Sequence, residues 1–594
     1  MKSTKILFFL VVSFFLNFAY SQDLELDWTE KLSYTNSKDG FFSHFIGTND
    51  EYVYAIYSNL ALRKTKQFDK AKIVVLNKES MKKVGSVALK GFKENSSQKA
   101  SYKDLEYLKT VILKEKVLVF WSKKSSSKSS KKEEMYVESF TTKLARSGKL
   151  KKIYTRNVPK DIKTSRFAES SLVVLSNKNV GDKIIVGAEE PSRGDNVQFN
   201  FVEMNDELEV SEEFKIELPI KSPSKSYGLS SNYHYGNDGN VYVSSYVSLS
   251  REERKNAPKG ANSSYCILSL INTETSDVST FEIKDDNKRI NGFKFVVSDK
   301  EVKIYGFFGD LLKDPKGNST HGVFFTTIDS KTLEANELGY TYFDKQTIET
   351  LFAKDQEDKK KTSGSRRKKD KEKDNDDSAL DIRFGIESIF VTPENDVVLF
   401  CSKMYNYSVT TCTSNSSGGQ SCTTNYYCQK SNVTALKVST EGDIVWASNL
   451  DRIITYSGTS IEDLNVVFKN DKYYVIYGST FKIDATSKKS KNRKRAAEMR
   501  DNFEYAVFEA ATGEYKKNNF LINDKNTAKK ERKYVSPTQI STFDETFYVN
   551  YMTMRQQIGW CVANVICFPT AYYSMLSGDT KVGSGYLGVI KVLD

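Results

Sequence analysis

One pattern of strands recurs about every 65 to 70 residues along this chain, and it limits the fold more than any other feature. Each copy has a strand of alternating aromatic and β-branched residues, a polar loop, a second such strand, then a turn and a third. Residues 51–58 (EYVYAIYS), 72–77 (KIVVLN) and 83–90 (KVGSVALK) form one copy, and 472–479 with 504–513 form another. Strict alternation with a period of two indicates half-buried strands, and a fixed repeat indicates one stacked supersecondary unit. Because the sequence has no long helical periodicity, we predict an all-β fold.

The repeat divides the chain into eight units, each of which reads as four short strands. A unit of this kind buries its faces only against its neighbours, so the series has to close into a ring. We therefore predict a single ring-shaped domain over residues 22–594. The eight units are expected to begin near Phe41, Tyr102, Glu169, Ser226, Arg289, Phe384, Ile453 and Val535.

The two ends of the chain supply a way to close the ring. The last unit ends with a third strand, residues 586–594 (YLGVIKVLD), and lacks an outer strand. Residues 24–34 (LELDWTEKLSY) precede the first inner strand, so we expect this N-terminal strand to complete the last unit. In this arrangement the chain resembles secreted bacterial β-propellers. The resemblance is architectural and carries no functional residues, because no WD, kelch or NHL signature is repeated; seven blades with an irregular unit, or two smaller propellers, are the alternatives.

The first 21 residues have the pattern of a secretory signal. Lys2 and Lys5 precede an apolar run over 6–20, and Ala19 and Ser21 are the small residues that signal peptidase prefers. The apolar run is shorter than the roughly 20 residues that a membrane span requires. We expect an exported monomer without a membrane span, located in the periplasm, on the cell surface or in the medium.

The sequence contains seven cysteines, and their uneven placement predicts disulfides in an exported protein. Cys412 and Cys422 flank a Gly-Gly tip, whereas Cys401 and Cys428 could close the neck of the same loop. Zinc is the rival interpretation, but the spacing lacks paired C-x-x-C knuckles and no histidine is near. Cys266 is expected to be a buried small apolar residue. The six disulfide candidates are Cys401, Cys412, Cys422, Cys428, Cys561 and Cys567.

The long loops are predicted to emerge mainly from one face of the ring, and they are basic. Binding residues are commonly found on long loops that a rigid scaffold positions. Four of these loops together carry a net charge of +16, against +12 for the whole chain: residues 60–71, 122–132, 251–260 and 481–495. A concentrated positive face would attract a polyanion, although runs of Lys and Ser also serve as solvated spacers. The candidate ligand-binding residues are Lys123, Lys124, Lys488, Lys489, Arg493, Lys494 and Arg495.

A further insertion, residues 355–381, contains nine basic and nine acidic residues and almost nothing apolar. A segment of this composition cannot build a core, so we predict that it is disordered.

Catalytic signatures are missing from the sequence. It contains three histidines, His44, His234 and His321, which fall in three different units, and no G-x-S-x-G, H-E-x-x-H or P-loop pattern. His234 lies on a predicted inner strand, where it could line the central channel, although a packed structural role is the simpler interpretation. No metal or cofactor is expected.

The sequence favours a non-catalytic exported binding protein over an enzyme. Its partner would be an anionic polysaccharide or envelope component, or a protein, held on the basic, long-looped face. The alternatives are a propeller hydrolase or lyase that acts on extracellular glycans, and a structural component of an envelope or secretion assembly.

Overall fold

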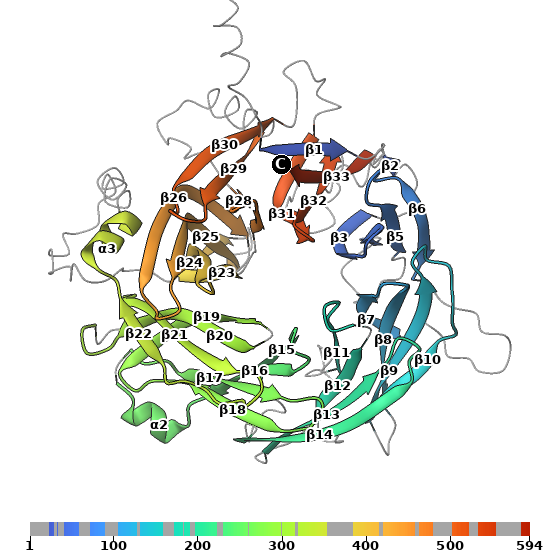
Figure 1. Cartoon of the computed structure of the whole chain (residues 1–594), viewed down its shortest axis with the longest axis horizontal. Coiled ribbons are helices and arrows are strands. Elements are labelled where there is room, and N and C mark those ends of the chain that lie inside the picture. The colour runs from blue at the N-terminus through green and yellow to red at the C-terminus, as the bar shows by residue number, and fades with distance from the viewer. Residues whose placement is uncertain are drawn as a thin grey trace, which may run out of the picture.

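The computed structural model of the chain is a ring of eight four-stranded antiparallel sheets, which is an eight-bladed β-propeller (Figure 1). The predicted all-β class and number of blades are therefore confirmed. The structure describes residues 23–28, 32–33, 41–58, 72–89, 105–126, 131–158, 172–181, 183–190, 196–221, 230–258, 260–298, 300–314, 319–352, 384–414, 420–457, 463–478, 502–521, 533–553 and 584–593.

Blades one to four follow one another in chain order, each with its first strand innermost. Blade one has β3 (Phe41–Thr48), β4 (Tyr52–Ser58), β5 (Lys72–Asn77) and β6 (Lys83–Ala88). Blade two has β7 (Leu105–Ile112), β8 (Lys116–Ser126), β9 (Lys131–Thr141) and β10 (Lys151–Val158). Blade three has β11 (Leu172–Ser176), β12 (Ile184–Glu190), β13 (Asn196–Met204) and β14 (Val210–Lys221). Blade four has β15 (Ser230–Tyr235), β16 (Val241–Ser248), β17 (Ser264–Ile271) and β18 (Val278–Ile283), with helix α2 (Arg251–Asn256) between β16 and β17.

Blades five to eight complete the ring. Blade five has β19 (Lys288–Val297), β20 (Glu301–Asp310), β21 (Gly322–Asp329) and β22 (Gly339–Tyr342), and helix α3 (Lys345–Phe352) follows it. Blade six has β23 (Phe384–Val391), β24 (Val397–Ser414), β25 (Gln420–Val438) and β26 (Ile444–Ser457). Blade seven has β27 (Leu464–Lys469), β28 (Lys472–Tyr477), β29 (Asn502–Glu509) and β30 (Tyr515–Leu521). Blade eight has β31 (Lys533–Phe543), β32 (Thr546–Thr553), β33 (Ser584–Val592) and β1 (Leu24–Trp28), and β2 (Leu32–Ser33) also pairs with β33.

The N-terminal strand closes the ring, as its sequence predicts. Strand β1 pairs antiparallel with β33, from Leu24 opposite Val592 to Trp28 opposite Gly588. Leu24 is fully buried in a cluster with Ile590 and residues of blade seven, so the first described strand of the chain is part of the core. The closure therefore joins the two ends of the chain by backbone hydrogen bonds and by apolar packing.

The hydrophobic core lies mainly between neighbouring blades. Phe199 and Phe201 of blade three stack with ring centroids 5.8 Å apart, and Tyr233 of blade four packs edge-on against Phe199. Blades eight and one meet in the same way, where the rings of Tyr548 and Phe45 lie 5.6 Å apart. Packing of this kind explains why each blade needs its neighbours for stability.

Most predicted blade boundaries agree with the structure to within a few residues. Blades one and six begin at Phe41 and Phe384, the predicted positions. The predicted start of blade seven at Ile453 is wrong, because Ile453 pairs with Ser431 inside β26 and the first strand of blade seven begins at Leu464. The outer strand of blade six is longer than those of most other blades, so its apolar end was mistaken for a new inner strand.

Three predicted loops contain regular structure. Residues 402–431 belong mostly to β24 and β25, residues 122–132 are mostly the ends of β8 and β9, and residues 251–260 contain α2. The signal region, the insertion over 355–381 and the loops over 60–71 and 481–495 lie outside the described residues. Within the described part of the chain, no helix is long and apolar enough to cross a membrane.

Candidate functional site

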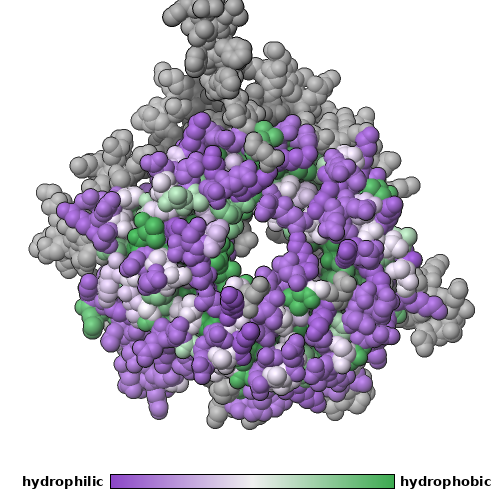
Figure 2. Space-filling view, viewed as in Figure 1, coloured by the Kyte–Doolittle hydropathy of each residue, from purple (hydrophilic) through white to green (hydrophobic). Residues whose placement is uncertain are grey.

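The ring has two different faces. On the turn face, short turns join the first strand of each blade to the second and the third to the fourth; on the loop face, the second strand is joined to the third. Figure 2 shows the turn face, which is mostly hydrophilic and surrounds a central opening. On this face, Asp544 of blade eight accepts hydrogen bonds from Lys78 and Thr48 of blade one and from Lys178 of blade three. Partial burial opposes the charged form, but these hydrogen bonds hold the pKa of Asp544 well below its usual range.

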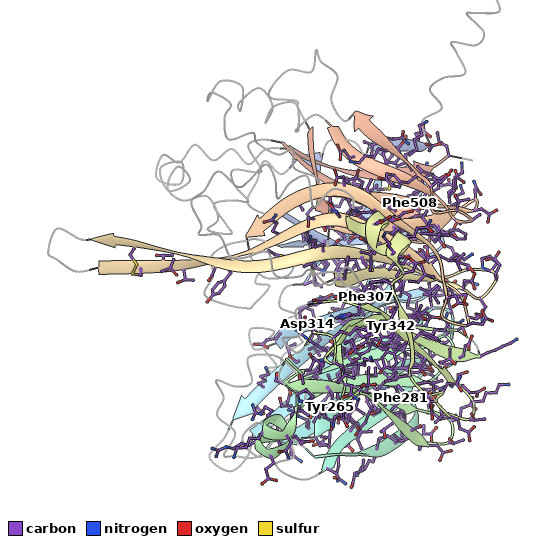
Figure 3. The ribbon with its side chains drawn as sticks, turned by 90° about the vertical axis from the view of Figure 1, so that its left-hand side faces the viewer. Tyr265, Phe281, Phe307, Asp314, Tyr342 and Phe508 are labelled. Atoms are coloured by element: carbon purple, nitrogen blue, oxygen red, sulfur yellow. A yellow bond between two sulfur atoms is a disulfide. The ribbon has the colours of Figure 1, made fainter. Side chains whose placement is uncertain are left out.

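The most prominent feature of the loop face is the hairpin of β24 and β25. These strands have 18 and 19 residues, and Figure 3 shows them projecting well beyond the rest of the ring. Strand β23 pairs with β24 as far as Lys403, and β26 pairs with β25 only from Tyr427 onward. We call residues 404–414 and 420–426, which project beyond these pairs, the arm.

The arm is uncharged and carries a covalent cross-link. Residues 404–429 contain no Asp, Glu, Lys or Arg, although 28% of the chain is charged. Cys412 and Cys422, two of the predicted disulfide candidates, lie opposite each other and form a disulfide. A hydrogen bond of 2.9 Å joins the hydroxyls of the next exposed pair on the same face, Thr410 and Thr424. An isolated two-stranded hairpin is marginally stable in water, so the disulfide limits its opening.

The predicted pairing of Cys401 with Cys428 is wrong. Both thiols are free and buried, and burial raises the pKa of each. The strand register explains the error, because Cys401 lies opposite Thr434 whereas Cys428 lies opposite Asn406. Five residues of extended strand, about 16 Å, therefore separate the two positions along the hairpin, which is too far for a disulfide. Cys266 is also free and buried, and Cys561 and Cys567 lie outside the described residues.

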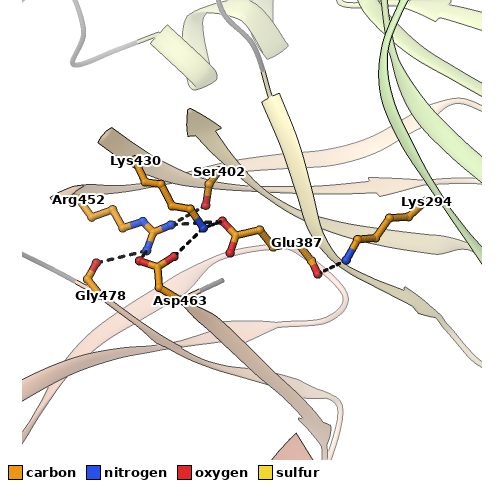
Figure 4. A network of polar contacts seen from close by, with 7 residues as sticks. All are labelled: Lys294, Glu387, Ser402, Lys430, Arg452, Asp463 and Gly478. Atoms are coloured by element: carbon orange, nitrogen blue, oxygen red, sulfur yellow. Dashed lines mark hydrogen bonds and ion pairs between the residues drawn. The ribbon is translucent and has the colours of Figure 1, made fainter. Parts of the chain in front are cut away.

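A buried ionic network holds the base of the arm (Figure 4). The Lys430 ammonium lies 2.9 Å from Glu387 Oε1 and 3.0 Å from Asp463 Oδ1, and the Arg452 guanidinium lies 2.8 Å from Asp463 Oδ2. The side chains of Arg452 and Asp463 are 0% exposed. Charges in such an environment are stable only when they are paired and hydrogen-bonded.

The network connects three blades. Arg452 also donates hydrogen bonds to the Ser402 hydroxyl and to the carbonyl of Gly478 in blade seven. Lys294 of blade five donates to the backbone carbonyl of Glu387, at 2.5 Å. Because Ser402 lies two residues before the arm in β24 and Lys430 lies four residues after it in β25, the network fixes where the arm leaves the ring.

Blade five carries a second polar cluster at its loop-face end. The Asp310 carboxylate accepts hydrogen bonds from Lys288 at 2.8 Å and from the Tyr342 hydroxyl at 2.5 Å. Burial opposes ionisation, but these contacts and the backbone N–H of Leu312 hold the pKa of Asp310 well below its usual range. Burial, together with the bond to Asp310, raises the pKa of Tyr342. A tyrosine held protonated in this way is a poor general base.

Large exposed apolar side chains on the loop face are found in three consecutive blades among the described residues. Tyr246 lies near the end of β16 in blade four, Leu312 follows β20 in blade five, Tyr342 ends β22 in blade five, and Tyr426 lies on the arm of blade six. Leu312 is 74% exposed and Tyr426 is 58% exposed. Tyrosine is enriched at protein-binding surfaces, so these side chains on three adjacent blades make the loop face the candidate interface.

The basic candidate residues are only partly described, and the described ones are not free loop residues. Lys123 and Lys124 lie in β8, opposite Glu134 and Glu133 of β9. The Lys124 ammonium lies 3.8 Å from Glu106 and 4.0 Å from Glu133. Nearby acidic groups therefore offset the positive charge here, which the sequence could not show because the pairing depends on the register of β8 and β9. Lys488, Lys489, Arg493, Lys494 and Arg495 lie outside the described residues.

The three histidines lie apart, as their sequence positions predict. His234 is exposed on the inner strand β15, and its ring packs 5.8 Å from Phe295 of blade five. Partial desolvation of its ring by these neighbours lowers the pKa of His234. His321 is fully buried in blade five, and its Nδ1 accepts a hydrogen bond from the Asp310 backbone. Within the described residues, no group of three or more His, Cys, Asp or Glu side chains could hold a metal ion.

No protein-family model and no curated protein matches this chain. Among solved structures, it is similar to the β-propeller domain of the Trilobed protease from Pyrococcus furiosus, with 12% identity, coverage of 72% of this chain and 96% of that one, and a TM-score of 0.30. It is also similar to Drosophila Plexin A in complex with Semaphorin 1b, with 9% identity, coverage of 76% and 87%, and a TM-score of 0.28. The Pyrococcus horikoshii acylaminoacyl peptidase is 9% identical, with a TM-score of 0.30, and the match covers 89% of this chain and 59% of the peptidase. These likenesses carry no functional argument, and the propeller assignment rests on the eight sheets of the chain itself.

Proposed function

We propose that this chain is a non-catalytic, exported propeller that binds a partner through its loop face. The observation that carries the proposal is the combination on blades four to six of the projecting arm with the exposed side chains of Tyr246, Leu312, Tyr342 and Tyr426. The disulfide of the arm supports export, because such bonds persist mainly in oxidising compartments.

A protein is the partner that these residues favour. Tyrosine and leucine provide large apolar contact areas, and the uncharged arm offers no electrostatic attraction to a polyanion. Binding to an anionic envelope polymer is the second version of the proposal, and it depends on the basic segments over 60–71 and 481–495.

The proposal is tested by placing a charge within the exposed apolar group. The full chain is immobilised, and its binding to a detergent extract of the cell envelope is measured by biolayer interferometry. We expect Leu312→Lys to reduce binding about tenfold or more, because an interface core excludes unpaired charge. Val445→Lys is the matched control, since Val445 is exposed near the start of β26 on the turn face. Equal binding by the two variants contradicts the proposal.

The protein version and the polymer version of the proposal predict a different dependence of binding affinity on salt. Binding to a sulfated polysaccharide is measured between about 50 and 500 mM salt for the wild type and for a variant with all the basic residues over 481–495 replaced by Gln. Affinity that falls with salt in the wild type, but not in the variant, supports the polymer version. Envelope binding that is unchanged by both salt and the substitutions supports the protein version.

A further inference from the structure

Among the described strands, the edge of β24 in the arm is a long row of backbone groups without a neighbour. Strand β23 stops pairing with β24 at Lys403, and no other described strand pairs with the same edge from Met404 to Ser414. The opposite edge of the arm, on β25, is open over only 420–426. Unpaired backbone N–H and C=O groups in an extended strand form a template for pairing with another chain.

Within the part of the chain that the structure describes, this edge lacks the usual protection against such pairing. Proteins protect edge strands with lysine or other charges, with proline, with bulges or by keeping the strand short. Residues 404–414 (MYNYSVTTCTS) contain no charge and no proline, and they form a regular ladder of 11 residues with β25. The disulfide and the buried network at Lys430 and Arg452 hold this edge extended and fixed in direction. The edge is therefore ordered in advance for a strand to be added.

We propose that the occupant of this edge is the β24 edge of a second copy of the chain. An antiparallel pair of identical edges is self-complementary about a two-fold axis, and it would form the four-stranded sheet β25–β24–β24–β25. This inference rests on the proposed function, because it makes the loop-face binding protein bivalent.

The distribution of charge supports a second copy. Two chains with a net charge of +12 repel each other over most of their surface, whereas the arm carries no charge and projects away from the ring. Pairing at the arm therefore brings two copies together where repulsion is weakest. A contact of this size is small, so we expect a weak dimer with a dissociation constant in the range of about 1 to 100 µM. Two linked rings would bind a surface with repeated partners more tightly than one ring.

Two opposed threonines of the arm provide a matched pair of variants. Thr410 on β24 and Thr424 on β25 lie opposite each other, are both exposed, and are hydrogen-bonded to one another. Replacing either by lysine removes the same hydrogen bond and adds the same charge. In the proposed dimer the two copies of residue 410 lie on adjacent strands, whereas the two copies of residue 424 lie about 14 Å apart, beyond the Debye length of about 8 Å.

The test is sedimentation velocity of the purified wild-type chain and of the two lysine variants, each over the same range of concentrations. We expect concentration-dependent dimers in the wild type, a shift of about tenfold or more to higher concentration in Thr410→Lys, and a shift below about threefold in Thr424→Lys. A monomer at every concentration, or equal shifts in the two variants, overturns the inference.

Hydrogen exchange locates the contact. Protection of 404–414 that increases with protein concentration supports pairing at β24, whereas protection of 420–426 alone, or of neither segment, overturns it. The dimer is measured without any partner, and envelope binding is measured separately on Thr410→Lys. A monomeric wild type that still binds envelope extract contradicts only the dimer, and a dimer without envelope binding contradicts only the proposed function.

Discussion

The two halves of the β24–β25 hairpin are held in order by different means. Within the ring, Val398, Phe400 and Leu436 are fully buried, and the hairpin rests on the ionic network around Arg452. In the arm the same strands have neither charge nor a neighbouring strand among those described, and a disulfide joins them near the tip. Burial therefore keeps the inner half of the hairpin ordered, whereas a covalent bond and one ladder of hydrogen bonds keep the outer half ordered.

The largest effect is expected from the buried network of the inner half. Arg452→Met should reduce the free energy of unfolding by about 3 to 5 kcal/mol, because it leaves the carboxylates of Asp463 and Glu387 buried without the guanidinium that pairs with them. Chemical denaturation measures the change. Lys591→Met is the control, because its ion pair with Asp27 is half exposed, and it should leave the midpoint unchanged within error. A loss below about 1 kcal/mol in Arg452→Met would show that the network does not stabilise the ring.

The disulfide tests the outer half. Replacing both Cys412 and Cys422 by Ser should reduce the free energy of local opening of the arm by about 2 to 3 kcal/mol, because the bond closes a short loop. Hydrogen exchange should increase in the arm while the unfolding midpoint of the ring stays the same. Cys428→Ser, at a buried position in the ring, should lower the unfolding midpoint of the ring and leave hydrogen exchange in the arm unchanged. Destabilisation of the whole ring by the double variant would show that the two halves are not independent.

The Asp310 cluster in blade five extends the comparison to a second loop-face site. Asp310→Asn should reduce the free energy of unfolding by about 2 kcal/mol near pH 7, because Lys288 and Tyr342 lose a charged acceptor. The folded pKa of Asp310 is depressed, so its contribution is complete above the unfolded value of about 4 and is lost as the pH falls below it. The difference between wild type and variant should therefore be constant above about pH 5 and shrink at lower pH. A difference that grows on acidification would contradict this assignment.

The smallest effect is expected at the exposed threonine pair of the arm. Thr410→Val removes one hydroxyl and its bond to Thr424 but keeps a β-branched side chain. We expect local opening of the arm to become easier by about 0.5 kcal/mol, measured by hydrogen exchange in the disulfide-bonded protein. A change as large as that of the double cysteine variant would mean that side-chain pairing, and not the disulfide, holds the arm.

Much of the ring could be predicted from local patterns. Alternating stretches such as 52–58 and 72–77 predict strands without knowledge of the partner strand. The expected half-burial is wrong for these two strands, because residues 52–57 and 73–76 are buried on both faces between neighbouring blades. The closure by β1 was predictable because the last unit lacked one strand and the N-terminus supplied it. The candidate site was less predictable. The arm was interpreted as a loop because it is rich in Ser, Thr and Asn and has a Gly-Gly tip, although Tyr405, Tyr407 and Val409 alternate with polar residues and were a signal for a strand.

The sequence by itself determined the class of fold, because strand periodicity is a property of neighbouring residues. It also favoured eight blades and the pairing of the two ends, and the tertiary structure decided for eight blades over the alternatives. Only the tertiary structure decided which charges meet, since Glu387, Lys430, Arg452 and Asp463 come from separate segments of the chain. It also decided that Lys124 faces Glu133 and that Cys401 and Cys428 stay apart. The physical reason is register: a shift of a single residue between paired strands changes every cross-strand contact, and local sequence does not specify it.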